Sequence, residues 1–193
     1  ALTMNQLAKG AAPYDLNVVS NISVDGDGDI AAYLAKKGAG LDKYAEKMEQ
    51  ISSYETDLTY GKFFEDQRVE LWQIDEELPE QKIDAFALSD VNKALKMQGK
   101  KPLTLNEDHY LINCNYKGTY SFIDTALKMH PEITINGQVL HRAYDEVMQD
   151  TFIMTSIGNN DRGTLIVPDK IANGLKKDMN ALLVRYKPDV NSN

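Results

Sequence analysis

The most chemically suggestive segment of the 193-residue chain runs from Asp25 to Asp29, where aspartates alternate with glycines. Closely spaced carboxylates are typical of calcium-binding loops, but an EF-hand loop also needs glycine at its sixth position and glutamate at its twelfth. Counted from Asp25, these positions hold Ile30 and Lys36, so the pattern fails at both. We therefore predict a turn in which glycines adopt positive φ and Asp27 or Asp29 caps the helix that follows.

Histidine and cysteine, the other residues suited to metal binding or catalysis, are few and widely spaced. His109, His130 and His141 form neither a His-Glu-x-x-His motif nor a helical pair. Cys114 follows an apolar segment, where we expect a small buried side chain, and a single cysteine allows no disulfide within the chain. The sequence holds no serine-nucleophile, dinucleotide or phosphate-loop motif. It therefore predicts no catalytic, cofactor-binding or metal-binding residue, leaving open a Ser, His and Asp set assembled by the fold.

A concentration of negative charge lies between Glu65 and Glu80, where seven acidic residues accompany only Arg68, a local net charge of −6. A solvated acidic edge is the simpler interpretation. The alternative is a docking face for a cationic amphipathic peptide, to which Trp72 and nearby tyrosines such as Tyr60 would add aromatic contacts. The sequence leaves both interpretations open.

The bulk composition is that of a globular protein with a substantial core. Hydrophobic residues make up 42% and charged residues 26% of the chain, which is ordinary for a folded domain of this size. The net charge of −8 disfavours nucleic acid or an anionic bilayer as a partner, because both would repel the protein. No apolar run reaches roughly 18 residues, so no segment is predicted to span a membrane, and no signal peptide is visible.

Apolar periodicity predicts strands that alternate with helices. Strands are expected at 14–21, 51–59, 69–74, 83–88, 110–114, 151–157, 165–167 and 181–186, with a hairpin at 133–140 around an Asn136-Gly137 turn. Helical segments are expected at 1–10, 30–37, 41–48, 60–64, 91–98, 119–129 and 169–175, the fifth capped by Ser89 and Asp90. Two strand–helix–strand units, near 86–95 and 164–175, share one plan.

These elements favour an α+β fold in which short helices pack on a mixed β-sheet, either as one compact unit or as two closely packed lobes. The side chains expected in its core are Val18, Ile30, Leu34, Phe86, Leu88, Leu95, Leu111, Ile112, Phe122, Leu127, Ile153, Ile166 and Leu183.

Six segments, at 13–20, 29–34, 41–46, 57–61, 88–102 and 165–169, share a further pattern in their order and spacing over most of the chain. Together they resemble the large extracellular domain of FtsX-like ABC-transporter permeases of Gram-positive bacteria, relatives of MacB-like and bacitracin-type exporters. The resemblance implies a non-catalytic domain that projects from the cell membrane at its extracellular face. In that family a cognate ATPase subunit drives the permease, and members handle antimicrobial peptides, lipoproteins or cell-wall factors.

The resemblance also implies a domain organisation. Residues 1–12 would lead in from a membrane helix, residues 13–188 would form the extracellular domain, and residues 189–193 would lead toward the next membrane helix. Because the chain starts at Ala1 and carries no membrane helix of its own, we expect an excised domain whose termini lie close together on one side. A freestanding secreted binding protein and a mechanical spacer domain are the alternatives.

Overall fold

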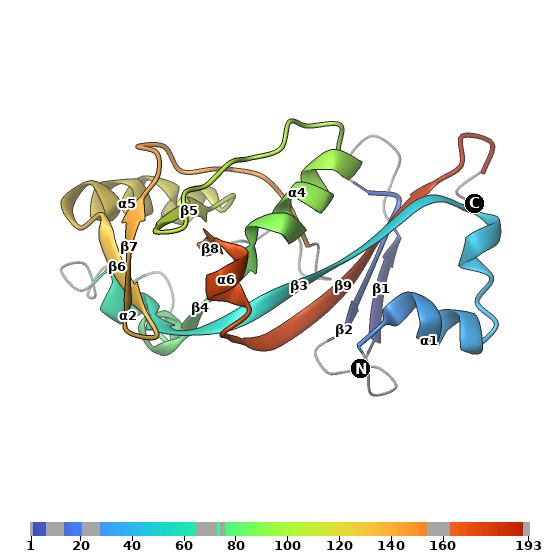
Figure 1. Ribbon diagram of the computed structural model, residues 1–193, viewed down its shortest axis with the longest axis horizontal. Helices are drawn as coiled ribbons and strands as arrows, with labels where there is room; N and C mark the ends of the chain where they lie inside the picture. Colours follow the sequence, from blue (N-terminus) through green and yellow to red (C-terminus); the bar gives the residue numbers. More distant parts are fainter. Residues whose placement is uncertain are drawn as a thin grey trace.

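A computed structural model describes residues 2–6, 14–20, 28–64, 73, 76–153 and 163–190, without the side chains of 2–6 and 117–119. Its main feature is a nine-stranded sheet flanked by short helices (Figure 1). The predicted α+β class with a mixed sheet is therefore confirmed.

The sheet combines antiparallel and parallel neighbours. Antiparallel pairs dominate, and only the pairs β4–β8 and β5–β7 are parallel among the described strands. The strand order is β1 (Leu2–Gln6), β2 (Leu16–Ser20), β9 (Lys176–Tyr186), β3 (Ala45–Thr59), β4 (Lys82–Ala87), β8 (Thr164–Val167), β5 (His109–Asn113), β7 (Gln138–Arg142) and β6 (Glu132–Ile135).

The helices are short and join the strands in the predicted alternation. They are α1 (Ile30–Lys36), α2 (Tyr60–Phe63), α4 (Leu88–Met97), α5 (Lys117–Met129) and α6 (Asp169–Ala172), with 3-10 turns η1 (Leu41–Lys43) and η3 (Leu78–Glu80). α4 ends at Met97, and Gly99, just after the C-cap Gln98, has φ 71° and supplies the left-handed residue that commonly stops a helix. Asn136 and Gly137 both have positive φ, at 48° and 78°, as the predicted tight hairpin turn between β6 and β7 requires.

The longest continuous feature is the antiparallel ribbon of β3 and β9. Its register runs from Ala45 opposite Tyr186 to Glu55 opposite Lys176, with irregularities near both ends. In Figure 1 the ribbon crosses the molecule from the half with α1, β1 and β2 to the half with β4 to β8 and α5. One sheet therefore joins the two halves.

The two faces of the sheet bury alternate side chains of the same strands. Ala85, Ala87, Leu165 and Val167 pack in a cluster with residues of α2, α5 and α6. Their neighbours Phe86 and Ile166 pack in a second cluster with α4. A third cluster lies between α1 and the β2–β9 pair. Of the predicted core residues, Leu88, Phe122 and Ile153 are half-buried and all the others are buried.

Two predicted helical segments are wrong. Residues 2–6 form β1, because their backbone pairs with β2 from Leu2 opposite Ser20 to Gln6 opposite Leu16. The apolar residues of 41–48 were expected on one helical face. Instead η1 ends at Lys43 and β3 begins at Ala45, where pairing with β9 takes over. Met48, in this part of β3, is 37% exposed.

Three further predictions need correction or fall outside the described residues. Of the strand expected at 151–157, the described part, 151–153, is irregular. Of the strand expected at 69–74, only Gln73 is described, and it is not in a strand. Asp90 was expected to cap α4, but its Oδ2 accepts from the backbone N–H of Ser52 on β3 at 3.0 Å. The residue at the N-cap position is Ala87, without a side-chain capping bond.

We expected the two chain ends to lie close together, but the start of β1 and the end of β9 are separated along the direction of the strands. β1 and β9 are both antiparallel to β2 and so run parallel to each other. Leu2 therefore lies level with Asn180, whereas the chain leaves the sheet at Tyr186. At about 3.3 Å per residue, the start of β1 and the end of β9 are about 20 Å apart along the strand direction. Both lie in the same half of the molecule (Figure 1).

Candidate functional site

The described part of the acidic string serves to begin α1. Asp29 accepts the backbone N–H of Ala32 at 3.0 Å, and Gly28 has φ 71°. Gln50 on β3 holds the same turn, because its side chain accepts from Ile30 N at 2.8 Å and donates to Gly28 O at 2.5 Å. The predicted cap and turn are confirmed for these residues, and Asp25 to Asp27 lie outside the described part.

A carboxyl group that the sequence did not single out is Asp84, on the middle of β4. It lies opposite Glu55 of β3. Burial, followed by a hydrogen bond and negative charge from Asp178 and then by the charge of Glu55, raises the pKa of Asp84 to about 8. Asp178 lies where the β3–β9 register shifts, between Lys177 and Met179. The Asp84 carboxyl therefore retains its proton near neutral pH. In the sequence, Asp84 could have been noticed as a single carboxyl group within an otherwise apolar strand.

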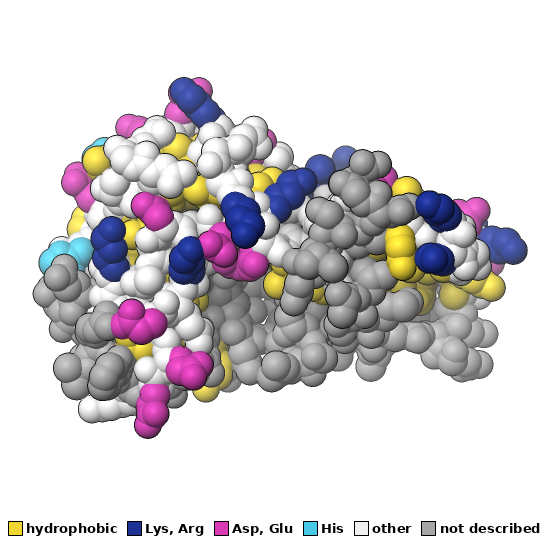
Figure 2. All heavy atoms as spheres, turned by 90° about the horizontal axis from the view of Figure 1, so that it is seen from below, with side chains coloured by type: hydrophobic (Ala, Val, Ile, Leu, Met, Phe, Trp, Pro, Cys, Tyr) yellow, Lys and Arg dark blue, Asp and Glu magenta, His cyan; other side chains and the backbone are white. Residues whose placement is uncertain are grey.

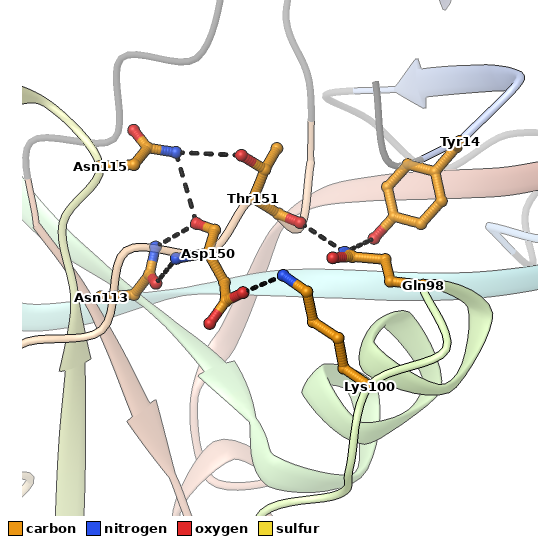
Figure 3. A network of polar contacts seen from close by, with 7 residues as sticks. All are labelled: Tyr14, Gln98, Lys100, Asn113, Asn115, Asp150 and Thr151. Carbon is orange, nitrogen blue, oxygen red and sulfur yellow. Dashed lines mark hydrogen bonds and ion pairs between the residues drawn. The ribbon is translucent and has the colours of Figure 1, made fainter. Parts of the chain in front are cut away.

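A network of amide side chains fixes the irregular segment 148–152 beside β5 (Figure 3). Asn113 forms two hydrogen bonds with the backbone of Asp150, donating to its carbonyl and accepting from its N–H, both at 2.8 Å. Asn115 donates to Asp150 O and Thr151 Oγ1, at 3.3 Å each. This pairing explains why no regular strand begins at Thr151, because the neighbouring backbone groups already bond with side chains.

The same network extends to α4 and to the start of β2. Gln98, just after α4, donates to Thr151 O at 2.7 Å and to the Tyr14 hydroxyl at 3.0 Å. Lys100 forms an ion pair with the Asp150 carboxylate. Burial raises the pKa of Tyr14, so its hydroxyl stays protonated. These groups satisfy one another, and the network's evident role is to hold segment 148–152 against α4.

α4 and α6 begin side by side, which gives the two strand–helix–strand units a common base. β4 and β8 pair in parallel, with Phe86 opposite Ile166. Asp169, the first residue of α6, accepts from the backbone N–H of Ser89 at 3.0 Å. One helix therefore caps a free N–H at the start of the other.

The histidines fall into two places. His109 and His141, distant in sequence, lie opposite each other on the parallel strands β5 and β7, with ring centroids 5.9 Å apart. His130 follows the C-terminal end of α5. Cys114 is buried, as predicted, and its Sγ lies 3.7 Å from the Tyr116 carbonyl. Sequence spacing could not bring His109 and His141 together, because only the strand order does so.

The prediction that Tyr60 adds an aromatic contact to a peptide-docking face is wrong. Its ring is buried and its hydroxyl donates to Gly163 O at 2.8 Å, so it offers no stacking surface. Trp72 lies outside the described residues, and the described Glu76, Glu77 and Glu80 are exposed. On the face drawn in Figure 2, acidic and basic side chains are interspersed rather than separated by sign.

Within the part of the chain that the structure describes, no three His, Cys, Asp or Glu side chains form a group able to hold a metal ion. Among the same residues, no helix has both the length and the apolar character needed to cross a bilayer. No protein-family model matches the chain, and neither the curated proteins nor the solved structures include a significant match.

Proposed function

We propose that the chain is a non-catalytic extracellular domain of an FtsX-like ABC-transporter permease, which binds a ligand or partner and couples it to movement of membrane helices. The proposal starts from the family resemblance of six segments spread over the chain. The structural observation that supports it best is the β3–β9 ribbon, which joins the two halves of the molecule in one sheet. Such a continuous sheet suits a body that moves as a rigid unit.

The packing of the ribbon favours stiffness. β9 has a strand neighbour on both sides, and its residues from Asn180 to Val184 are all buried. Ser52 Oγ donates to Asn180 Oδ1 at 2.7 Å, so a buried hydrogen bond joins β3 to β9 in addition to the backbone ladder. A displacement at one end of the ribbon would therefore be passed to the other end with little loss.

The alternative, a freestanding secreted binding protein, is favoured by the separation of the chain ends. Packed helices lie about 8–10 Å apart, whereas the start of β1 and the end of β9 are about 20 Å apart along the strands. Two adjacent membrane helices would therefore have to approach each other through residues outside β1 and β9.

The test is the location of the domain in the product of the complete gene. Lys101 lies in an exposed loop, whereas the natural Cys114 is buried. A Lys101→Cys variant should react with a membrane-impermeant maleimide in intact cells, and the labelled protein should be in the membrane fraction with an ATPase subunit. The wild-type protein, in which this domain has only the buried Cys114, is the matched control, and any label that it takes up is subtracted.

The other outcomes separate the alternatives. Labelled protein in the culture medium, free of the membrane, would support the freestanding binding protein. Labelling only after cell lysis would exclude both extracellular proposals. Membrane-bound protein that never copurifies with an ATPase would retain the location and reject the transporter.

A further inference from the structure

We propose that His109 and His141 form a surface site for one late first-row divalent cation, such as Cu²⁺, Ni²⁺ or Zn²⁺, bound through their Nε2 atoms. The site lies at the end of the sheet opposite β1, where β5, β7 and β6 are neighbours. It does not depend on the proposed transporter function.

The strand register places the two imidazoles together. His109 and His141 are direct neighbours on β5 and β7, and Glu132 of β6 is the next residue in the same row. Leu140 and Tyr110, which flank this row along the strands, are fully buried, so alternation directs the histidines to the opposite face. The side chains of His109 and His141 are 29% and 45% exposed, which leaves room for water ligands.

Each ring has a carboxylate on its Nδ1 atom. Asp108 Oδ1 lies 2.7 Å from Nδ1 of His109, and Glu132 Oε1 lies 3.2 Å from Nδ1 of His141. A neutral histidine that donates its Nδ1 proton to a carboxylate keeps a lone pair on Nε2, and metal-binding histidines commonly have this arrangement.

The distance between the rings fits one shared ion. Two imidazoles on a tetrahedral ion, each with a metal–nitrogen distance of about 2.1 Å, have ring centroids about 5 Å apart. The observed separation is 5.9 Å, and the rings are inclined by 54°. We expect rotation of these two partly exposed side chains to close the difference of about 1 Å on metal binding. Two protein ligands, with water completing the shell, give a site weaker than a structural zinc centre. A site with only two protein ligands is compatible with the finding that no three metal-ligating side chains form a group among the described residues.

Metal titration of the untagged protein tests the proposal, with His130→Asn as the matched control. The chain has three histidines, so the control removes the one that is not a member of the pair. Calorimetry with CuSO₄, NiCl₂ and ZnCl₂ at neutral pH should show one ion per chain, with Cu²⁺ bound most tightly. His109→Asn and His141→Asn should each weaken binding at least tenfold, and His130→Asn should leave it unchanged. Electron paramagnetic resonance of the Cu²⁺ form should show two nitrogen ligands.

The carboxylates provide a second measurement. Asp108→Asn and Glu132→Gln, which keep the shape of the side chains, should weaken binding by about tenfold, because outer carboxylates orient the ring and raise its basicity. Unchanged melting temperatures of the metal-free variants would show that the fold is intact. Wild-type protein that binds no ion at millimolar concentration would overturn the proposal, as would equal affinity in His109→Asn or loss of binding in His130→Asn.

Discussion

At the scale of the residue, Asp84 is the group whose protonation is most closely linked to folding. An aspartate in an unfolded chain has a pKa of about 3.9, and the folded protein raises that of Asp84 to about 8. Between these values the folded state binds more protons than the unfolded state, so stability falls as pH rises through this window. Above pH 8 the Asp84 carboxyl is ionised, and the loss of stability that its ionisation causes has reached its full size.

We therefore expect Asp84→Asn to stabilise the protein at pH 9 by about 1–3 kcal/mol and to flatten the decline between pH 4 and 8. Urea unfolding at several pH values measures both effects. Asp57→Asn, which changes an exposed carboxyl on β3, is the control and should follow the wild-type profile. Identical profiles for Asp84→Asn and the wild type would show that Asp84 titrates normally.

Alanine substitutions at Gly163 and Gly137 distinguish the cost of backbone strain from the cost of steric conflict. Both have positive φ, at 135° and 78°. A Cβ at Gly163 would lie 3.1 Å from Ile123 Cδ1, whereas a Cβ at Gly137 would meet nothing within 4 Å. We expect Gly137→Ala to cost about 1 kcal/mol and Gly163→Ala about 2–3 kcal/mol of unfolding free energy. Thermal unfolding of both variants makes the comparison, and equal losses would mean that Ile123 moves away freely.

At the scale of the element, α4 is joined to β3 by apolar packing and by one carboxylate, that of Asp90. β4 ends at Ala87, and the backbone N–H of the neighbouring Ser52 takes Asp90 as its acceptor instead of a strand. Asp90→Ala should leave that partly buried N–H unpaired and cost about 1–3 kcal/mol. Asp90→Asn keeps an acceptor oxygen and should cost less. Chemical denaturation distinguishes the two, and equal costs would assign the effect to charge rather than to the hydrogen bond.

The elements that sequence predicts best are those with strong local signals. The hairpin at Asn136-Gly137 follows from two residues that tolerate positive φ, and α4 follows from its apolar spacing and from Gly99. β1 was missed because Leu2 and Met4 fit a strand as well as a helix, and only pairing with β2 distinguishes the two. The role of Asp90 was missed because helix capping and bonding to another strand require the same residue type.

At the scale of the whole molecule, the strand order is what local sequence could not reveal. Nothing near His109 or His141 indicates that β5 and β7 are parallel neighbours, and nothing near Asp84 indicates that Asp178 lies beside it. Both groupings arise from pairings between segments far apart in the chain. Some tyrosines, by contrast, lie where local sequence suggests. Tyr54, Tyr60 and Tyr110 belong to one buried cluster, as expected of tyrosines in an ordinary core.

If the β3–β9 ribbon is a stiff connector, its backbone amides should exchange slowly with deuterium. We expect the slowest exchange at 51–53 and 180–184, where both strands are buried and where opening requires disruption of the sheet. Mass spectrometry of peptic fragments measures this, with the exposed start of β3 at 46–48 as an internal reference. Faster exchange at 51–53 than at 46–48 would indicate a hinge in the ribbon and contradict rigid coupling.

The position of β9 between β2 and β3 also dictates an order of assembly. Leu16 to Ser20 must pair with Val184 to Asn180, so a growing chain leaves β2 unpaired on that edge until the segment 176–186 has emerged from the ribosome. Pairings between such distant segments form slowly, and an open strand edge invites association with other chains in the meantime. We therefore expect the β1–β2 pair to need shielding during synthesis, by chaperones or by the residues that follow it, until β9 is available.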